Sequence, residues 1–194
     1  MNRPKRKGTA AETAVVRYAR GHGFPYAYRI TLGGSTDFGD VSLALFTPSG
    51  SPPIRLVVEV KATGGRVQMK PWLDELDREC GAWSPVVEAT GFLVVKYPGV
   101  GDRSVDRWLA VIPDWSDLYF THMTVFPETP WFKGGVNGSN GFLAQVLRQK
   151  FVKLGPNPAR RMMIHGTSDV ALVTSFDNAL WLSMYRWPIQ PATE

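Results

Sequence analysis

Hydrophobic residues in the first third of the chain follow two different periods. Between residues 9 and 21 they recur every three or four positions, which predicts an amphipathic helix that ends at the glycines of "GHG". Runs of β-branched, aliphatic and aromatic residues follow at 26–32, 40–46 and 54–62, separated by stretches rich in Gly, Ser and Pro. The pattern therefore predicts one helix followed by three strands.

A second helix is predicted over residues 70–80, where Pro71 stands near the first turn. Two strands at 91–97 and 107–112 follow it. After residue 122 the pattern is less regular and begins with a loop rich in Gly, Pro and Asn. The elements predicted beyond that loop are helices at 142–154 and 175–187 and a short strand at 160–166.

This order of elements is typical of a mixed α/β domain rather than of a regular alternating parallel fold. We expect three parts: a basic flexible arm at residues 1–7, a core domain at 8–122, and a C-terminal extension at 123–194 that packs on the core.

Composition and charge limit the possible surroundings and partners. Cys80 is the one cysteine, which excludes an internal disulfide framework and is typical of a reducing compartment. Because no apolar run is long enough for a membrane span or follows the basic N-terminus as in a secretory signal, we expect a cytoplasmic protein without a membrane partner.

The net charge is +5, and four of these charges come from one short basic group at Arg3, Lys5, Arg6 and Lys7. Such a group can contact nucleic-acid phosphates or simply solubilise a tail.

The third predicted strand carries charged residues within an apolar run. Side chains alternate across a strand, so Glu59 and Lys61 share one face, roughly 6 to 7 Å apart along the strand. Asp40 opens the preceding strand, and a hairpin would bring it near Glu59.

Clustered carboxylates repel each other, and a divalent cation such as Mg²⁺ removes that conflict. A lysine beside the cation can orient a water or balance the charge of a phosphate, which is chemistry for phosphodiester hydrolysis. The alternative for an isolated Glu-x-Lys is a solvated strand face.

The spacing of Asp40 and the triplet Glu59-Val60-Lys61 resembles the PD-(D/E)xK nuclease superfamily, with Gly39 where the motif has proline. The stretches "KGTAAETAVVRYARGHGF" and "GGSTDFGDV" resemble the first helix and the metal-site loop of archaeal-type and phage Holliday junction resolvases. The resemblance covers roughly residues 5 to 120 and fades beyond them.

The resemblance implies a restriction-endonuclease-like fold, with a mixed central β-sheet flanked by helices. It implies that Mg²⁺, or Mn²⁺ in its place, is bound by Asp40, Glu59, the Val60 carbonyl and Glu12. Lys61 would be the catalytic lysine. Besides Lys61, the catalytic residues would be Glu12, Asp40, Glu59 and Ser35, the last on a loop near the scissile phosphate. The residues that would contact DNA, besides the basic group, are Ser35, Thr36 and Gln68.

Two of these assignments have a structural alternative. Glu12 also completes a capping box with Thr9, in which the glutamate bonds back to the backbone at the start of the helix. Asp37 competes with Asp40 for the metal, but its place in the loop favours a role in a turn.

The predicted function is a metal-dependent, structure-selective endonuclease, specifically a Holliday junction resolvase. Because a four-way junction has near two-fold symmetry, paired cuts in branched DNA predict a homodimer. The alternatives are another nuclease of the same superfamily, of nicking, flap or restriction type, and a catalytically inactive DNA-binding protein of this fold.

Overall fold

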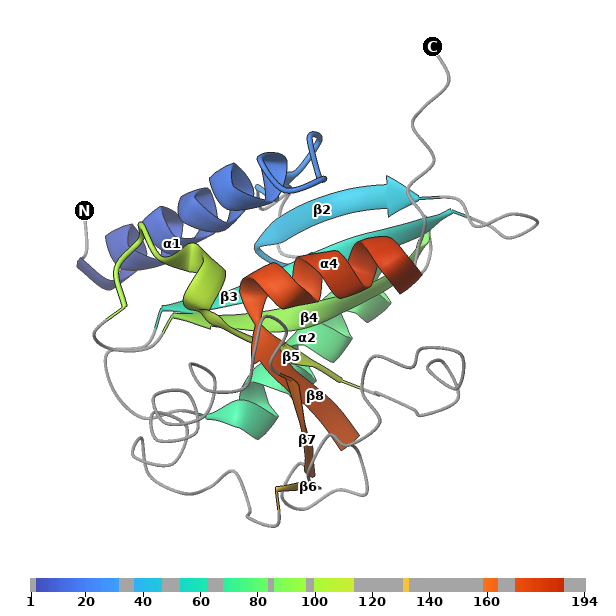
Figure 1. Cartoon of the computed structure of the whole chain (residues 1–194). Helices are drawn as coiled ribbons and strands as arrows, with labels where there is room; N and C mark the ends of the chain where they lie inside the picture. The colour runs from blue at the N-terminus through green and yellow to red at the C-terminus, as the bar shows by residue number, and fades with distance from the viewer. Residues whose placement is uncertain are drawn as a thin grey trace.

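The structure is a computed structural model that describes residues 3–31, 37–46, 53–62, 68–83, 86–96, 100–113, 131–132, 159–163 and 170–186. Within these ranges, one mixed β-sheet lies between helices on its two faces (Figure 1). The strand order is β1-β2-β3-β4-β5-β8-β7-β6. The predicted α/β class, a mixed sheet flanked by helices, is confirmed.

β3 (Ile54–Ala62), the strand that carries Glu59 and Lys61, lies inside the sheet between two other strands. β2 (Val41–Phe46) and β3 pair antiparallel, and β3 pairs parallel with β4 (Glu88–Lys96). A parallel pair needs a crossover connection, which helix α2 (Met69–Trp83) supplies here. The remaining strands are β1 (Tyr28–Arg29), β5 (Leu109–Ile112), β6 (Trp131–Phe132), β7 (Ala159–Met163) and β8 (Val170–Ser175).

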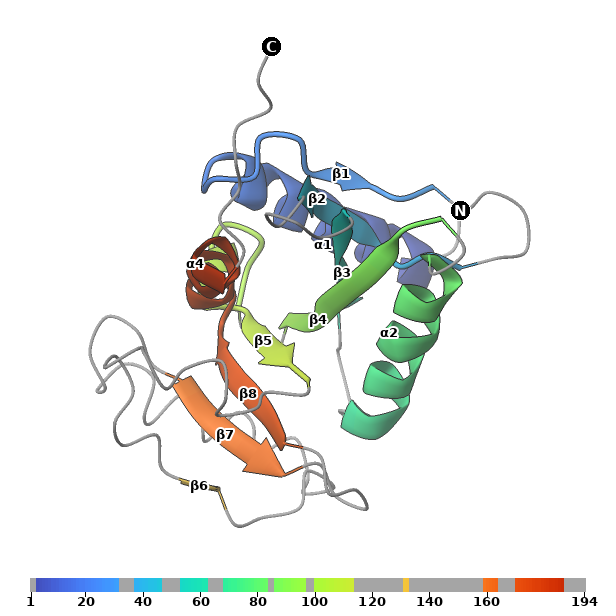
Figure 2. The same cartoon turned by 90° about the vertical axis from the view of Figure 1, so that its right-hand side faces the viewer.

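Two apolar clusters hold the helices on opposite faces of the sheet (Figure 2). On one face, helix α1 (Arg3–Arg20) packs on β3 and helix α4 (Phe176–Arg186) packs on β5 and β8. Both helices contribute to a cluster that includes Val15, Leu56 and Phe176. On the other face, α2 packs on β4 and β5 through a cluster that includes Leu76 and Leu93. Because side chains alternate along β3, Leu56, Val58 and Val60 face α1, and Glu59 and Lys61 face α2.

The first helix differs from the prediction at its N-terminus. α1 begins at Arg3, six residues before Thr9, so its backbone includes the segment predicted as a flexible arm. The side chains of residues 3–7 lie outside the described residues. Thr9 therefore lies inside the helix, where its carbonyl accepts a 2.7 Å hydrogen bond from the Thr13 hydroxyl. The capping box of Thr9 and Glu12, given above as the alternative to a metal role for Glu12, is consequently wrong.

The segment beyond residue 122 takes part in the same sheet. β8 pairs antiparallel with β5, and β7 pairs with β8. α4 buries Phe176, Ala179 and Leu180 in the core that α1 also contacts. The strand predicted at 160–166 and the helix predicted at 175–187 correspond to β7 and α4. The helix predicted at 142–154 lies outside the described residues. Among the helices that the structure describes, none combines the length and apolarity needed to cross a membrane.

Candidate functional site

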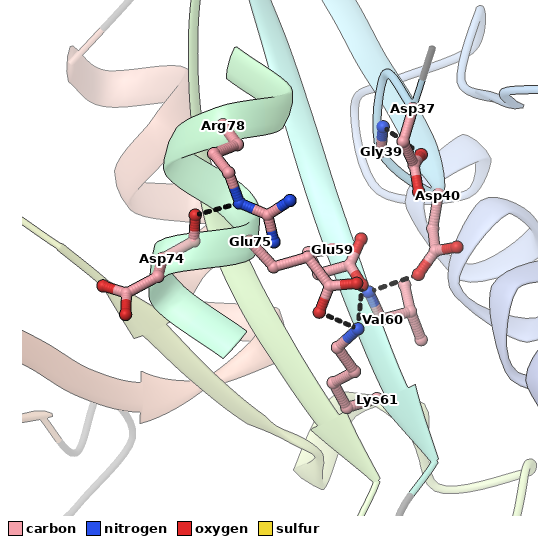
Figure 3. Close-up of polar contacts among 9 residues, drawn as sticks. All are labelled: Asp37, Gly39, Asp40, Glu59, Val60, Lys61, Asp74, Glu75 and Arg78. Atoms are coloured by element: carbon pink, nitrogen blue, oxygen red, sulfur yellow. Dashed lines mark hydrogen bonds and ion pairs between the residues drawn. The ribbon is translucent and has the colours of Figure 1, made fainter. Parts of the chain in front are cut away.

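The β2–β3 hairpin brings Asp40 and Glu59 together. Val41 pairs with Val58 in the antiparallel register, so the residues next to them, Asp40 and Glu59, lie opposite each other. Asp40 Oδ2 accepts a 2.8 Å hydrogen bond from the Val60 N–H (Figure 3). The Asp40 and Glu59 carboxyl groups are close enough to share a hydrogen bond. Glu59 is only 3% exposed, so this strand face is not a solvated one.

Lys61 lies between two carboxylates from different elements. Its ammonium forms ion pairs with Glu59 on its own strand and with Glu75 on α2, the latter with Nζ and Oε2 2.5 Å apart (Figure 3). Burial alone would lower the pKa of Lys61, but hydrogen bonds and Coulombic attraction to these two carboxylates outweigh it and raise the pKa. Lys61 therefore remains positively charged at physiological pH.

Burial and mutual repulsion favour the protonated forms of the nearby acids. Burial, with repulsion from Glu59, raises the pKa of Asp40 to about 8, although the bond from the Val60 N–H opposes the shift. Burial, with repulsion from Glu79, raises the pKa of Glu59 to about 8 despite its pairing with Lys61. The pKa of Glu79 rises to about 7, first through burial. These groups hold protons near neutral pH unless another positive charge replaces the protons.

Two glutamates of α2 that the sequence analysis did not identify also belong to the site. Glu75 and Glu79 stand four residues apart and thus on one face of the helix. Together with Asp37 they place carboxylate oxygens within 4.8 Å of one another, a spacing that can accommodate a metal ion. One feature of the sequence could have indicated this position: Glu79 falls on the same buried face of the helix as Leu73 and Leu76.

Asp37 has the turn role that was predicted and a second one as well. Its Oδ1 accepts a 3.2 Å hydrogen bond from the Gly39 N–H, which fixes the turn before β2. Its charge contributes to the raised pKa of Glu79, after the larger effect of burial. Asp37 thus joins the acidic group in addition to shaping the loop.

Gly39 occupies a position that the fold restricts to glycine. Its φ is +89°, in the left-handed region. A Cβ there would lie 2.6 Å from Val57 Cγ1 and 3.3 Å from Glu79 Oε2. Proline, whose ring holds φ near −65°, cannot adopt this conformation. The conformation at Gly39 therefore suits glycine and excludes proline.

Trp83, the last residue of α2, holds the Asp37 loop against the helix. Its indole Nε1 donates a 3.0 Å hydrogen bond to the Phe38 carbonyl, and the two rings lie 4.8 Å apart. On the other side, the Arg55 guanidinium lies 4.3 Å from the centre of the Trp83 ring. These contacts fix the loop between the two aspartates of the site.

Of the other predicted site residues, Glu12 and Gln68 bond to partners outside the Asp40–Glu59 pair. Glu12 forms an ion pair with Arg29, with Oε2 and Nη2 2.5 Å apart, and its charge contributes to the raised pKa of Asp40 after the larger effects of burial and Glu59. Gln68 is exposed, and its carbonyl accepts a 3.2 Å hydrogen bond from the Trp72 N–H at the start of α2. Ser35 and Thr36 lie outside the described residues.

Comparison with known proteins assigns no family, since no protein-family model matches the chain and no curated protein matches it significantly. The chemistry of the site must therefore be inferred from its own residues.

Proposed function

We propose that this protein is a Mg²⁺-dependent endonuclease of the PD-(D/E)xK type, with a restriction-endonuclease-like fold, that hydrolyses DNA phosphodiester bonds in the cytoplasm. The observation that carries the proposal is the grouping of Asp40, Glu59 and Lys61 at one point of the β2–β3 hairpin. A buried glutamate and a half-buried aspartate next to a charged ammonium cost free energy, and the contacts within the fold do not by themselves explain why they are placed together.

The donor set fits a hard divalent cation. Mg²⁺ prefers carboxylate and carbonyl oxygens, and the site offers the carboxylates of Glu59 and of Asp40, which the Val60 N–H orients through Oδ2. The residues that would hold the cation are Asp40 and Glu59, with the Val60 carbonyl and Glu12 as further oxygen donors. A bound cation would lower the pKa of a coordinated water and neutralise charge on the scissile phosphate. Mn²⁺ has similar ligand preferences and would substitute.

Lys61 would act on the substrate rather than on the cation, because a protonated amine cannot be a metal ligand. Its ion pairs to Glu59 and Glu75 fix the ammonium beside the carboxylates. From there it can orient the attacking water or stabilise the charge that develops on the phosphate.

The proposed substrate is branched DNA, specifically the four-way junction, cut by a homodimer. The resemblance of the first helix and of the metal-site loop to junction resolvases supports this assignment. Phosphate contacts would come from Arg3, Lys5, Arg6 and Lys7 at the start of α1, together with Ser35, Thr36 and Gln68. Binding should therefore weaken steeply as salt increases.

The deciding experiment offers end-labelled four-way junctions, flaps and plain duplex to the purified protein with Mg²⁺ or Mn²⁺. Paired symmetric nicks in the junction support resolution, whereas flap or duplex cutting indicates another nuclease of the superfamily. Asp40→Asn and Glu59→Gln should abolish cutting, while Asp74→Asn, an exposed acid of α2 paired with Lys70, should not. Junction binding without cutting under either cation would establish the inactive DNA-binding alternative.

A further inference from the structure

One carboxylate oxygen of the site is buried without a hydrogen-bond donor. Glu79 is 2% exposed, and its Oε2 has no hydrogen-bond partner among the described residues. The place where a Cβ of Gly39 would stand lies 3.3 Å from this oxygen, so Oε2 faces the loop that carries Asp37. A buried polar atom without a partner costs on the order of 1–3 kcal/mol, and more when it is charged. The chain thus maintains a costly acceptor that points towards other acidic residues.

Asp37 and Glu75 supply the other oxygens around this position. The three carboxylates bring oxygens within 4.8 Å of one another, from a loop and from two successive turns of α2. Oxygens that bind one divalent cation at 2.0–2.6 Å lie at most about 4–5 Å apart, so the observed spacing suits a single ion. Asp37 is exposed and Glu79 is buried, so the three carboxylates extend from the solvent into the protein.

Charge balance indicates room for more than one cation. Among the described residues, two cationic side chains, Arg29 and Lys61, form ion pairs within the acidic group. The group consists of Glu12, Asp37, Asp40, Glu59, Glu75 and Glu79. Six acids against two cations leave four negative charges when all are ionised, and one divalent ion neutralises only half of that excess.

We propose that Asp37, Glu75 and Glu79 form a second site for an oxygen-preferring divalent cation, such as Mg²⁺ or Mn²⁺, beside the Asp40–Glu59 pair. Binding at this site does not require nuclease activity, but any contribution to cleavage rests on the proposed function. Glu75 belongs both to this triad and to the Lys61 ion pair. A cation in the triad therefore competes with Lys61 for Glu75 and makes the ammonium more available to a phosphate.

The test is a Mn²⁺ titration of the full chain, with free Mn²⁺ followed by its paramagnetic resonance signal. Wild-type protein should bind two Mn²⁺ per chain. Glu79→Gln should bind one, and Asp40→Asn should also bind one, having lost the other ion. Asp37→Asn provides a second variant of the triad, because its amide oxygen can still accept the bond from the Gly39 N–H that shapes the turn. The matched control, Asp74→Asn, should still bind two.

A single Mn²⁺ in the wild type that Glu79→Gln still binds would overturn the proposal, as would two Mn²⁺ retained in both Glu79→Gln and Asp37→Asn. In either case, a proton shared with Glu59, rather than a cation, would balance the charge of the Glu79 carboxylate. The result is separable from the proposed function. Two bound Mn²⁺ without any DNA cutting would leave the second site standing and remove the nuclease, whereas cutting with one bound Mn²⁺ would do the reverse.

Discussion

The backbone N–H of Val60 donates a 2.8 Å hydrogen bond to Asp40 Oδ2. The strand that carries Glu59 and Lys61 therefore also orients the aspartate of the neighbouring strand. A change in the β2–β3 register would break this bond and turn the charged side chains to the other face, because the side-chain period of a strand is two. The site thus depends on the hairpin register as much as on the identity of its acids.

Gly39→Ala should destabilise the protein and disturb the site. The φ of +89° is unfavourable for alanine, and the added Cβ would lie 2.6 Å from Val57 Cγ1. We expect a loss of about 1–3 kcal/mol in the free energy of unfolding, measured by chemical denaturation. Gly81→Ala is the matched control, since Gly81 lies in α2 and a Cβ there meets no atom within 4 Å. Equal stability of the two variants would contradict this account of Gly39.

Trp83→Phe should loosen the loop that carries Asp37. The variant keeps a large aromatic ring but loses the hydrogen bond to the Phe38 carbonyl, which contributes about 1 kcal/mol. We expect lower thermal stability and weaker Mn²⁺ binding at the triad, both measured on the same samples. Trp72→Phe, a change in a half-buried residue of α2 that packs on the second apolar cluster, is the control. If both variants bind Mn²⁺ equally well, Trp83 does not position the loop.

The central part of the site could be predicted because it depends on local geometry. Strand alternation places Glu59 and Lys61 on one face, and the short connection between β2 and β3 brings Asp40 to them. The acids of α2 were missed because their position depends on how a crossover helix packs over the sheet. An acid among Leu73 and Leu76 was the one local sign of that packing.

Long-range pairing also explains the other differences. β8 joins β5 although about sixty residues separate them, and no local pattern encodes such a register. The segment that sequence analysis assigns to an extension therefore completes the sheet. At the other end, the basic residues before Gly8 are part of the helix, so the predicted start of α1 at Thr9 was too late.

Lys61→Met should separate chemistry from cation binding. The variant keeps the length of the side chain but removes the charge that pairs with Glu59 and Glu75. We expect DNA cleavage to fall by two orders of magnitude or more, about 3 kcal/mol in the barrier, while Mn²⁺ still binds. Lys70→Met, which removes an exposed lysine paired with Asp74, should cleave normally. Full activity of Lys61→Met would remove Lys61 from the catalytic group.

Without divalent cations, the stability of the protein should fall as the pH rises from about 4 to about 8. The pKa of Asp40 and of Glu59 rises to about 8 on folding, and that of Glu79 to about 7, so the folded state binds more protons than the unfolded state in this window. Each extra proton bound by the folded state changes the free energy of unfolding by about 1.4 kcal/mol per pH unit. Chemical denaturation in EDTA at pH 5, 6, 7 and 8 measures the slope.

Mg²⁺ should reverse this loss at pH 8, because the cation takes the place of the protons and binds only the folded arrangement. Glu79→Gln should show a shallower pH dependence between pH 5 and 7, since it removes one of the titrating carboxyls. Asp74→Asn should follow the wild type, because Asp74 is exposed and paired with Lys70 at the surface. Stability that rises with pH in EDTA would mean that the buried carboxylates are already balanced by positive charges of the protein itself.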